Sequence, residues 1–264
     1  MTAQNARHGD RSVTVLSFDT STAAFAAAIV RDGTMLDSIV SFTERNHSVR
    51  ILSEIKELLS RNGIRGSDLD AVAVGQGPGS YTGVRIAVTA AKTLAWAWNK
   101  PLIGVSSLQA LAYGAWNHLR KANEDMVSDR NHWIVPLMDA RRGQVYTCRY
   151  SADLSGEWSM IDPDGIRLIE DWARRIEQEA TLDAQVSKIW FVGDVETHRT
   201  TIELAEQSGA NLRTLAFDMD AAAVGQLAEL RFRLGERDDV HSFVPNYTQL
   251  AEAEAKLLAA SRGE

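Results

Sequence analysis

The sequence predicts an α/β protein of two lobes, each built from a mixed β-sheet flanked by helices. The chain opens with three strand-like segments and then alternates helix and strand. After a polar stretch at 121–131, a second hairpin begins a similar series. Such alternation is typical of layered α/β folds. We place the first lobe at 12–111 and the second at 112–248, and a last helix at 249–261 is a candidate for a return to the first lobe.

The first lobe begins with an antiparallel meander after a polar leader. Apolar runs predict strands at 13–18, 24–30 and 35–41, and Asp32-Gly33 favours the positive φ of a hairpin turn. Apolar residues at helical spacing predict a helix at 47–62. Strands and helices then alternate at 69–74, 81–98, 102–105 and 107–120.

The second lobe is predicted to repeat this plan loosely. A hairpin joins strands at 133–139 and 144–150. Helical patterns follow near 167–180, 196–208 and 220–235, with strands near 188–193 and 212–217.

Composition limits the classes of function. The 264 residues carry a net charge of -7, which argues against a general electrostatic grip on nucleic acid. The single cysteine, Cys148, excludes an internal disulfide and suits a reducing compartment. No run approaches the roughly 20 apolar residues of a membrane span, and the first residues lack an apolar signal segment. We therefore expect a cytoplasmic protein that does not associate with membranes.

The turn after the first strand is a candidate phosphate loop. Asp19, Thr20 and Ser21 offer a carboxylate and two hydroxyls, which could hold a phosphate together with a metal ion or water. The same residues also make a purely structural turn, by bonding side chain to backbone. Both interpretations stay open from the residues alone.

A glycine-rich loop at 75–79 precedes the helix at 81–98, and Ser80 can cap that helix. Glycines allow a ligand to approach the backbone, and a helix start offers free N–H groups to an anion. The loop lacks the Lys-Ser/Thr ending of a Walker loop and the third glycine of the dinucleotide fingerprint. Pro78 also excludes a nucleophile elbow. The alternative is a turn that simply needs positive φ.

Metal and anion sites have little support. No two of the six histidines are three or four residues apart, and one cysteine cannot build a zinc cluster, so we expect no metal. Arg141 and Arg142, between the strands of the second hairpin, could bind an anion or form a solvated turn.

Three stretches resemble the TsaB family, a paralogue of the catalytic threonylcarbamoyl transferase TsaD. They are LSFDTSTAAFAAAIVRDG at 16–33, the glycine loop with its helix and strand at 75–112, and MDARRGQVYTCRY at 138–150. The resemblance implies an actin/Hsp70-like (ASKHA) fold, with 19–21 as a vestigial phosphate loop. The family's usual Pro-x-Tyr-Leu-Arg ending differs here, because Thr248-Gln249 replace Leu-Arg.

The resemblance also implies a chain without its own catalysis or cofactor. In the paralogue, two histidines after the Pro-Leu-Ile-Gly-Val strand hold the catalytic metal. Aligning that strand with 101–105 puts Ser107 and Leu111 at their positions. A serine hydroxyl is a poor metal ligand and leucine is none.

The implied role is a scaffold or activating subunit. It would pair with TsaD for threonylcarbamoyl transfer to tRNA adenosine, with the ATPase TsaE completing the complex and tRNA bound only through the complex. A homodimer would form when TsaD is absent. The alternative is an active small-molecule kinase or nucleotide hydrolase of actin-like fold, in which Asp19 and the glycine loop serve ATP and magnesium. A peptidase is a third interpretation, but the sequence offers no nucleophile–base pair for it.

The helix at 81–98 has two rows of small or apolar residues. One row, which we assign to the first sheet, is Val84, Ala87, Val88, Ala91, Leu94, Ala95 and Trp98. Related subunits pair through this helix and the one at 47–62, which indicates that the other row meets a partner. The predicted interface is Leu52, Ile55, Gly83, Ile86, Ala90, Thr93 and Ala97. The alternative is that the helix at 47–62 of the same chain buries this row.

Overall fold

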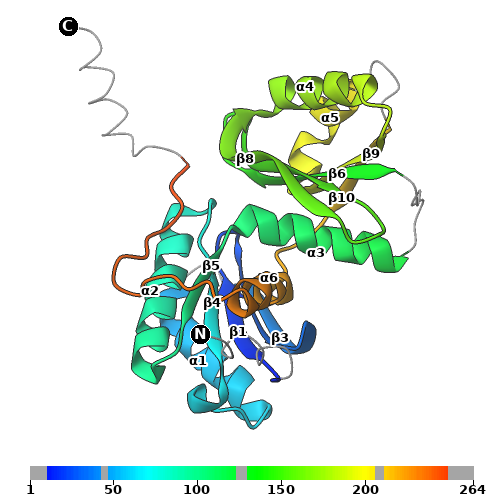
Figure 1. Ribbon diagram of the computed structural model, residues 1–264. Helices are drawn as coiled ribbons and strands as arrows, with labels where there is room; N and C mark the ends of the chain where they lie inside the picture. Colours follow the sequence, from blue (N-terminus) through cyan, green and yellow to red (C-terminus); the bar gives the residue numbers. More distant parts are fainter. Residues whose placement is uncertain (1–10, 43–46, 123–129, 206–210, 249–264) are drawn as a thin grey trace, which may run out of the picture.

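The chain folds around two five-stranded mixed sheets of identical topology. A computed structural model describes residues 11–42, 47–122, 130–205 and 211–248 (Figure 1). The first sheet has the order β3-β2-β1-β4-β5 and the second the order β8-β7-β6-β9-β10. In each, the three strands that come first along the chain pair antiparallel and the last two add in parallel. The predicted α/β fold of two lobes, each a mixed sheet flanked by helices, is therefore confirmed.

The elements of the first sheet are β1 (Thr14–Asp19), β2 (Ala24–Arg31), β3 (Thr34–Phe42), β4 (Ala71–Gly75) and β5 (Leu102–Val105). Its helices are α1 (His47–Arg61), α2 (Tyr81–Trp98) and α6 (Ala221–Arg233). The second sheet contains β6 (Asn131–Asp139), β7 (Gln144–Ala152), β8 (Trp158–Leu168), β9 (Val186–Gly193) and β10 (Leu212–Ala216). Its helices are α3 (Ser107–Ala122), α4 (Ile169–Leu182) and α5 (Arg199–Ala205).

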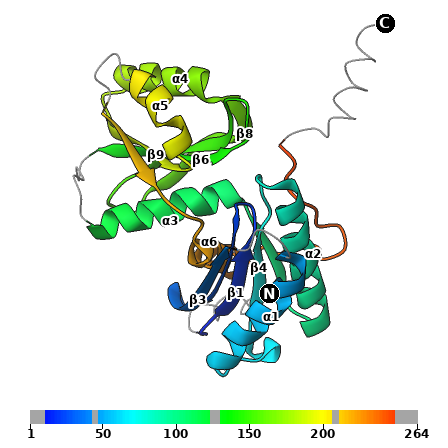
Figure 2. The ribbon, with the colours of Figure 1, turned by 180° about the vertical axis from the view of Figure 1, so that it is seen from behind.

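The helices form layers on both faces of each sheet (Figures 1 and 2). On the first sheet, α1 and α2 cover the outer face and α6 covers the inner face. On the second, α3 covers the inner face, while α4 and α5 lie outside. The two inner helices contact each other, so one continuous apolar core runs between the lobes.

Strand β1 shows how the sequence produces these layers. Side chains alternate between the faces of a strand. Leu16 and Phe18 belong to the outer core beneath α1 and α2. Ser17 faces inward, and its hydroxyl donates a 2.6 Å hydrogen bond to the carbonyl of Ala221 at the start of α6. Gly225 allows α6 to lie close, because a Cβ there would be 2.5 Å from a methyl of Val30.

Two features differ from the sequence-based expectation. The predicted second lobe extends to residue 248, whereas α6 and the residues after it pack against the first sheet. The segment 249–261, for which that return was expected, lies outside the described residues. Strand β8 was not predicted, because Pro163 and Gly165 interrupt its pattern. It is an edge strand that pairs only with β7, where a proline without an N–H is tolerated. None of the helices in the described ranges is long and apolar enough to cross a membrane.

Candidate functional site

The carboxyl group of Asp19 lies at the end of β1, fully buried where the lobes meet. One of its oxygens accepts a 2.6 Å hydrogen bond from the Ser107 hydroxyl, and the other accepts a 2.5 Å bond from the Ser21 N–H. The Ser107 oxygen in turn accepts from the N–H of Gly77 at 3.0 Å. Burial raises the pKa of Asp19, and the bonds from Ser107 and Ser21 partly oppose that rise. Both carboxyl oxygens are thus engaged within the chain.

The glycine-rich loop encloses protein atoms. A Cβ on Gly75 would lie 1.6 Å from Oδ2 of Asp19, and one on Gly79 would lie 2.4 Å from the carbonyl oxygen of Ser21. That carbonyl accepts a 2.7 Å hydrogen bond from the N–H of Ser80. Gly75 and Gly79 are explained by the close approach of the 19–21 turn to this loop.

Thr20 makes the second contact between this turn and α2. Its hydroxyl donates a 2.6 Å hydrogen bond to the carbonyl of Gly83, and a Cβ on Gly83 would lie 2.0 Å from the Thr20 carbonyl oxygen. Ser80 caps α2 as predicted, accepting from the Gly83 N–H at 3.3 Å. Gly83 therefore has an intramolecular reason to be glycine, and its place in the predicted interface stays a prediction.

A small cavity lies where the two lobes meet. A cavity of about 70 Å³ lies between the β1–β2 turn and the ends of β6 and β9, and its lining includes Thr22, Phe42, Leu111, Gly193 and Phe217. Ligand pockets usually span roughly 300–1,000 Å³. This cavity is too small to hold a nucleotide as it stands.

Ser107 and Leu111, at the two positions predicted to replace metal-binding histidines, do not fit a metal. The Ser107 hydroxyl is committed to Asp19 and Gly77, and Leu111 is buried in the core between the lobes. In the part of the chain that the structure describes, no group of three His, Cys, Asp or Glu side chains could hold a metal ion.

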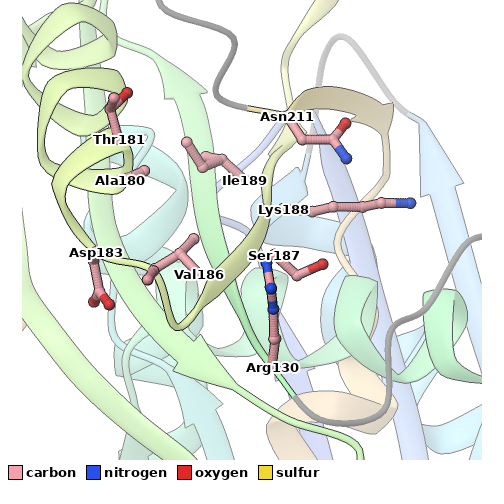
Figure 3. Close-up of a pocket in the computed structure, with 10 residues that line it drawn as sticks. Arg130, Ala180, Thr181, Asp183, Val186, Ser187, Lys188, Ile189 and Asn211 are labelled. Atoms are coloured by element: carbon pink, nitrogen blue, oxygen red, sulfur yellow. The ribbon is translucent and has the colours of Figure 1, made fainter.

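A larger cavity, of about 350 Å³, lies at the far end of the second lobe (Figure 3). It is lined by the end of α4, the start of β9, Arg130, Lys188 and Asn211. No residue that the sequence singled out for chemistry lines it. Arg141 and Arg142 lie exposed in the β6–β7 turn with positive φ. Among the described residues, neither guanidinium has an ion-pair partner.

The outer surface of α2 contains most of the predicted interface. The row assigned to the sheet lies against the outer core, with Leu94 and Trp98 only partly buried, so that assignment is confirmed. In the other row, Ile86 and Ala90 are half-buried against this core, while Thr93 and Ala97 are exposed.

On α1, Leu52 is 51% exposed, but Ile55 is 2% exposed and belongs to the core. Ile55 is therefore corrected from interface to core, because helical spacing alone does not show how far α1 tilts onto the sheet. Trp96 of α2 is 69% exposed. Its exposure excludes the core within this chain and adds a large apolar side chain to the surface.

Comparisons with known proteins agree with this geometry. The family model "TsaD: tRNA N6-adenosine threonylcarbamoyltransferase" matches residues 41–257. The tRNA threonylcarbamoyladenosine biosynthesis protein TsaB of Bacillus subtilis is 35% identical over 95% of this chain and 100% of its own length. The chain belongs to the TsaB family. The predicted resemblance is thereby confirmed, and the family's members are named for tRNA threonylcarbamoyladenosine biosynthesis.

Other relatives extend the comparison. The TsaB protein of Escherichia coli is 35% identical over 62% of this TsaB-family chain and 66% of its own length. A tRNA N6-adenosine threonylcarbamoyltransferase of Anaeromyxobacter dehalogenans is 40% identical over 36% of this chain and 33% of its own length. The solved structure of YeaZ from Pseudomonas aeruginosa superimposes with a TM-score of 0.66, at 27% identity, covering 89% of this chain and 99% of that one.

Proposed function

We propose that this chain is a non-catalytic subunit that binds the transferase TsaD and supports threonylcarbamoyl transfer to tRNA adenosine. The observation that carries the proposal is the closed polar cluster at the lobe junction. Ser107 stands where the paralogue has a metal ligand, and its hydroxyl is taken up by Asp19 and Gly77. A chain that belongs to this family but has no such ligands is suited to assist a catalytic partner.

The outer surface of α2 supports the choice of docking face. It presents Thr93, Trp96 and Ala97 to solvent, and Leu52 of α1 is also exposed. Exposed aromatic side chains beside small residues are typical of the centres of protein interfaces. TsaD would bind here, a second copy of the chain would bind here when TsaD is absent, and TsaE would complete the complex. tRNA would be held only by the complex, in the cytoplasm.

A nucleotide-dependent enzyme and a peptidase fit less well. Asp19 is sequestered, the cavity described at the lobe junction measures about 70 Å³, and the 19–21 turn is bonded to the start of α2. The one thiol, Cys148, is buried, and burial raises its pKa well above the ordinary value, which is the opposite of an activated nucleophile.

The test is a titration of TsaD with the variant Ala90→Arg. We expect binding to be lost, since the arginine would clash with a partner helix and bury an unpaired charge. Ala184→Arg adds the same charge at an exposed site on the second lobe and should bind like wild type. Wild-type affinity in Ala90→Arg would place the interface elsewhere.

Ala90 is half-buried, so an arginine there could unfold the chain. A second variant at an exposed position therefore tests the same surface. Ala97 is exposed about two turns further along the same row, and Ala97→Arg should keep the fold while weakening TsaD binding. If Ala90→Arg is unfolded and Ala97→Arg binds normally, α1 and α2 bury this row within the chain and the proposed interface is wrong.

A further inference from the structure

The residues after α6, here called the strap (236–248), cross the first lobe to reach α2. The strap is pinned at the edge of β5. The Asp238 carboxylate accepts from the Gly104 N–H at 2.7 Å, and the Asp238 N–H donates to the Leu102 carbonyl at 2.9 Å. The Phe243 ring packs over Gly104, where a Cβ would lie 2.3 Å from it. Its path along β5 is therefore defined by packing as well as by hydrogen bonds.

Further along, the strap is hydrogen-bonded to side chains on the outer side of α2. Lys92 donates to two strap carbonyls, at 2.8 and 3.1 Å. The Arg85 Nε donates to the Tyr247 hydroxyl at 2.8 Å, and the Arg85 guanidinium lies 3.8 Å from the centre of the Tyr81 ring. The rings of Tyr81 and Tyr247 are 6.1 Å apart. The side chains of Tyr81, Arg85 and Tyr247 are exposed, and they lie at the start of the α2 surface that is proposed to bind TsaD.

Asn246, the residue before Tyr247, makes hydrogen bonds to both lobes. The main-chain N–H of Asn246 donates to the carbonyl of Gln76 in the first lobe at 2.7 Å. Its side-chain amide donates to Asp164 of β8, in the second lobe, at 2.9 Å. Ser106, at the beginning of α3, and the Cys148 thiol also lie against the Asp164 carboxyl. Asn246 thus bonds one lobe through its backbone and the other through its side chain.

We propose that the neighbouring residues Asn246 and Tyr247 couple the outer surface of α2 to closure of the two lobes. The bond from Asn246 to Asp164 exists only while β8 stays at its present distance, because a hydrogen bond is lost once donor and acceptor separate beyond about 3.5 Å. Tyr247 holds the strap at the α2 end of the same link. Release of Tyr247 frees Asn246 and lets the lobes open, whereas a partner that covers Tyr81 and Arg85 keeps the lobes closed.

This coupling depends on the proposed function in one respect, which is that the partner on α2 is TsaD. Coupling between two sites is reciprocal. Breaking the Asn246–Asp164 link must therefore weaken binding on α2, and disturbing α2 must open the lobes.

The distance between the lobes is measured in the free chain by double electron–electron resonance. Spin labels are attached at Thr34→Cys and Gln178→Cys. Both positions are exposed, one in each lobe and neither on α2, and buried Cys148 leaves the labelling selective. We expect Asn246→Ala to broaden the distance distribution. The matched control is Asn117→Ala, which loses a side-chain hydrogen bond to Gln226 between α3 and α6. A distribution in Asn246→Ala that coincides with both wild type and control would overturn the proposal.

The decisive variants lie on the first lobe. In the described structure, Tyr247 and Arg85 have no hydrogen bond or ring contact with the second lobe, yet Tyr247→Ala and Arg85→Leu should both broaden the distribution as Asn246→Ala does. If Tyr247→Ala fails to fold, Tyr247→Phe, which removes only the hydroxyl bonded to Arg85, should broaden it to a smaller extent. Wild-type distributions in the folded variants would show that Tyr247 is not coupled to the lobes.

Binding of TsaD tests reciprocity. Asn246→Ala should weaken it by about 5-fold or more, the lower range of measured couplings. Unchanged affinity together with open lobes would overturn the coupling. The distances in the free chain are measured without TsaD, whereas the Ala90→Arg titration measures TsaD binding. The two experiments therefore distinguish a wrong partner from a wrong link between the lobes.

Discussion

The close contact between Gly75 and Asp19 allows a quantitative test of the lobe-junction cluster. A methyl group at position 75 would lie 1.6 Å from Oδ2 of Asp19 and 2.8 Å from Oγ of Ser107. The carboxyl group would have to move in Gly75→Ala, and it would lose the hydrogen bonds from Ser107 and Ser21. Because Asp19 is fully buried, no water is available to replace them.

The magnitude follows from those two bonds. Each buried hydrogen-bonding group left unsatisfied costs about 1–3 kcal/mol, so the two lost bonds in Gly75→Ala should lower the free energy of unfolding by about 2–6 kcal/mol. Asp19→Ala leaves the same donors, the Ser107 hydroxyl and the Ser21 N–H, without an acceptor. It should lower the free energy of unfolding by a similar amount. In the double variant, the methyl group added at position 75 occupies space that the carboxyl group has left. The combined cost should therefore resemble that of Asp19→Ala alone, so the coupling between the sites should equal the cost of Gly75→Ala by itself, about 2–6 kcal/mol.

Urea unfolding of the four proteins measures this coupling, with the midpoint compared at constant m-value. Additive costs, within about 0.5 kcal/mol, would refute the reasoning. They would mean that the carboxyl group is not held where the structure places it and that it remains free to serve a ligand.

Two further predictions concern pH and metal. Hydrogen bonds from Arg61 and Asn62 lower the pKa of Asp37 from 3.8 to about 2, so this carboxylate stabilises the fold above pH 3.8 and loses that contribution as pH falls toward 2. Asp37→Asn should consequently melt below wild type near neutral pH, with the gap closing between pH 3.8 and 2; a gap of constant size would contradict this. The purified chain should hold no stoichiometric zinc or iron, because Ser107 and Leu111 cannot replace two histidines. Elemental analysis that finds one transition metal per chain would disprove it.

Local sequence determined the elements whose signals are local. Ser80 predicts the start of α2, and the structure places its cap there. The strand at 102–105 is confirmed without change as β5. Apolar runs separated by turn residues predicted the opening meander, since such runs and turn chemistry depend on neighbouring residues. The stretch at 75–112 was also enough to indicate the family.

Only the tertiary structure decided what covers each surface. Spacing marks Ile55 and Ala90 as members of apolar rows, but the packing of α1 and α2 buries the first fully and the second in part. The glycine loop could have held a phosphate, and it holds the chain's own 19–21 turn instead. Helix α6 returns to the first sheet across 204 residues of sequence, and the Ser17 hydroxyl donates a hydrogen bond to the Ala221 carbonyl. The sequence period records which face of an element is apolar, whereas the partner of that face depends on contacts between distant segments, which no local pattern encodes.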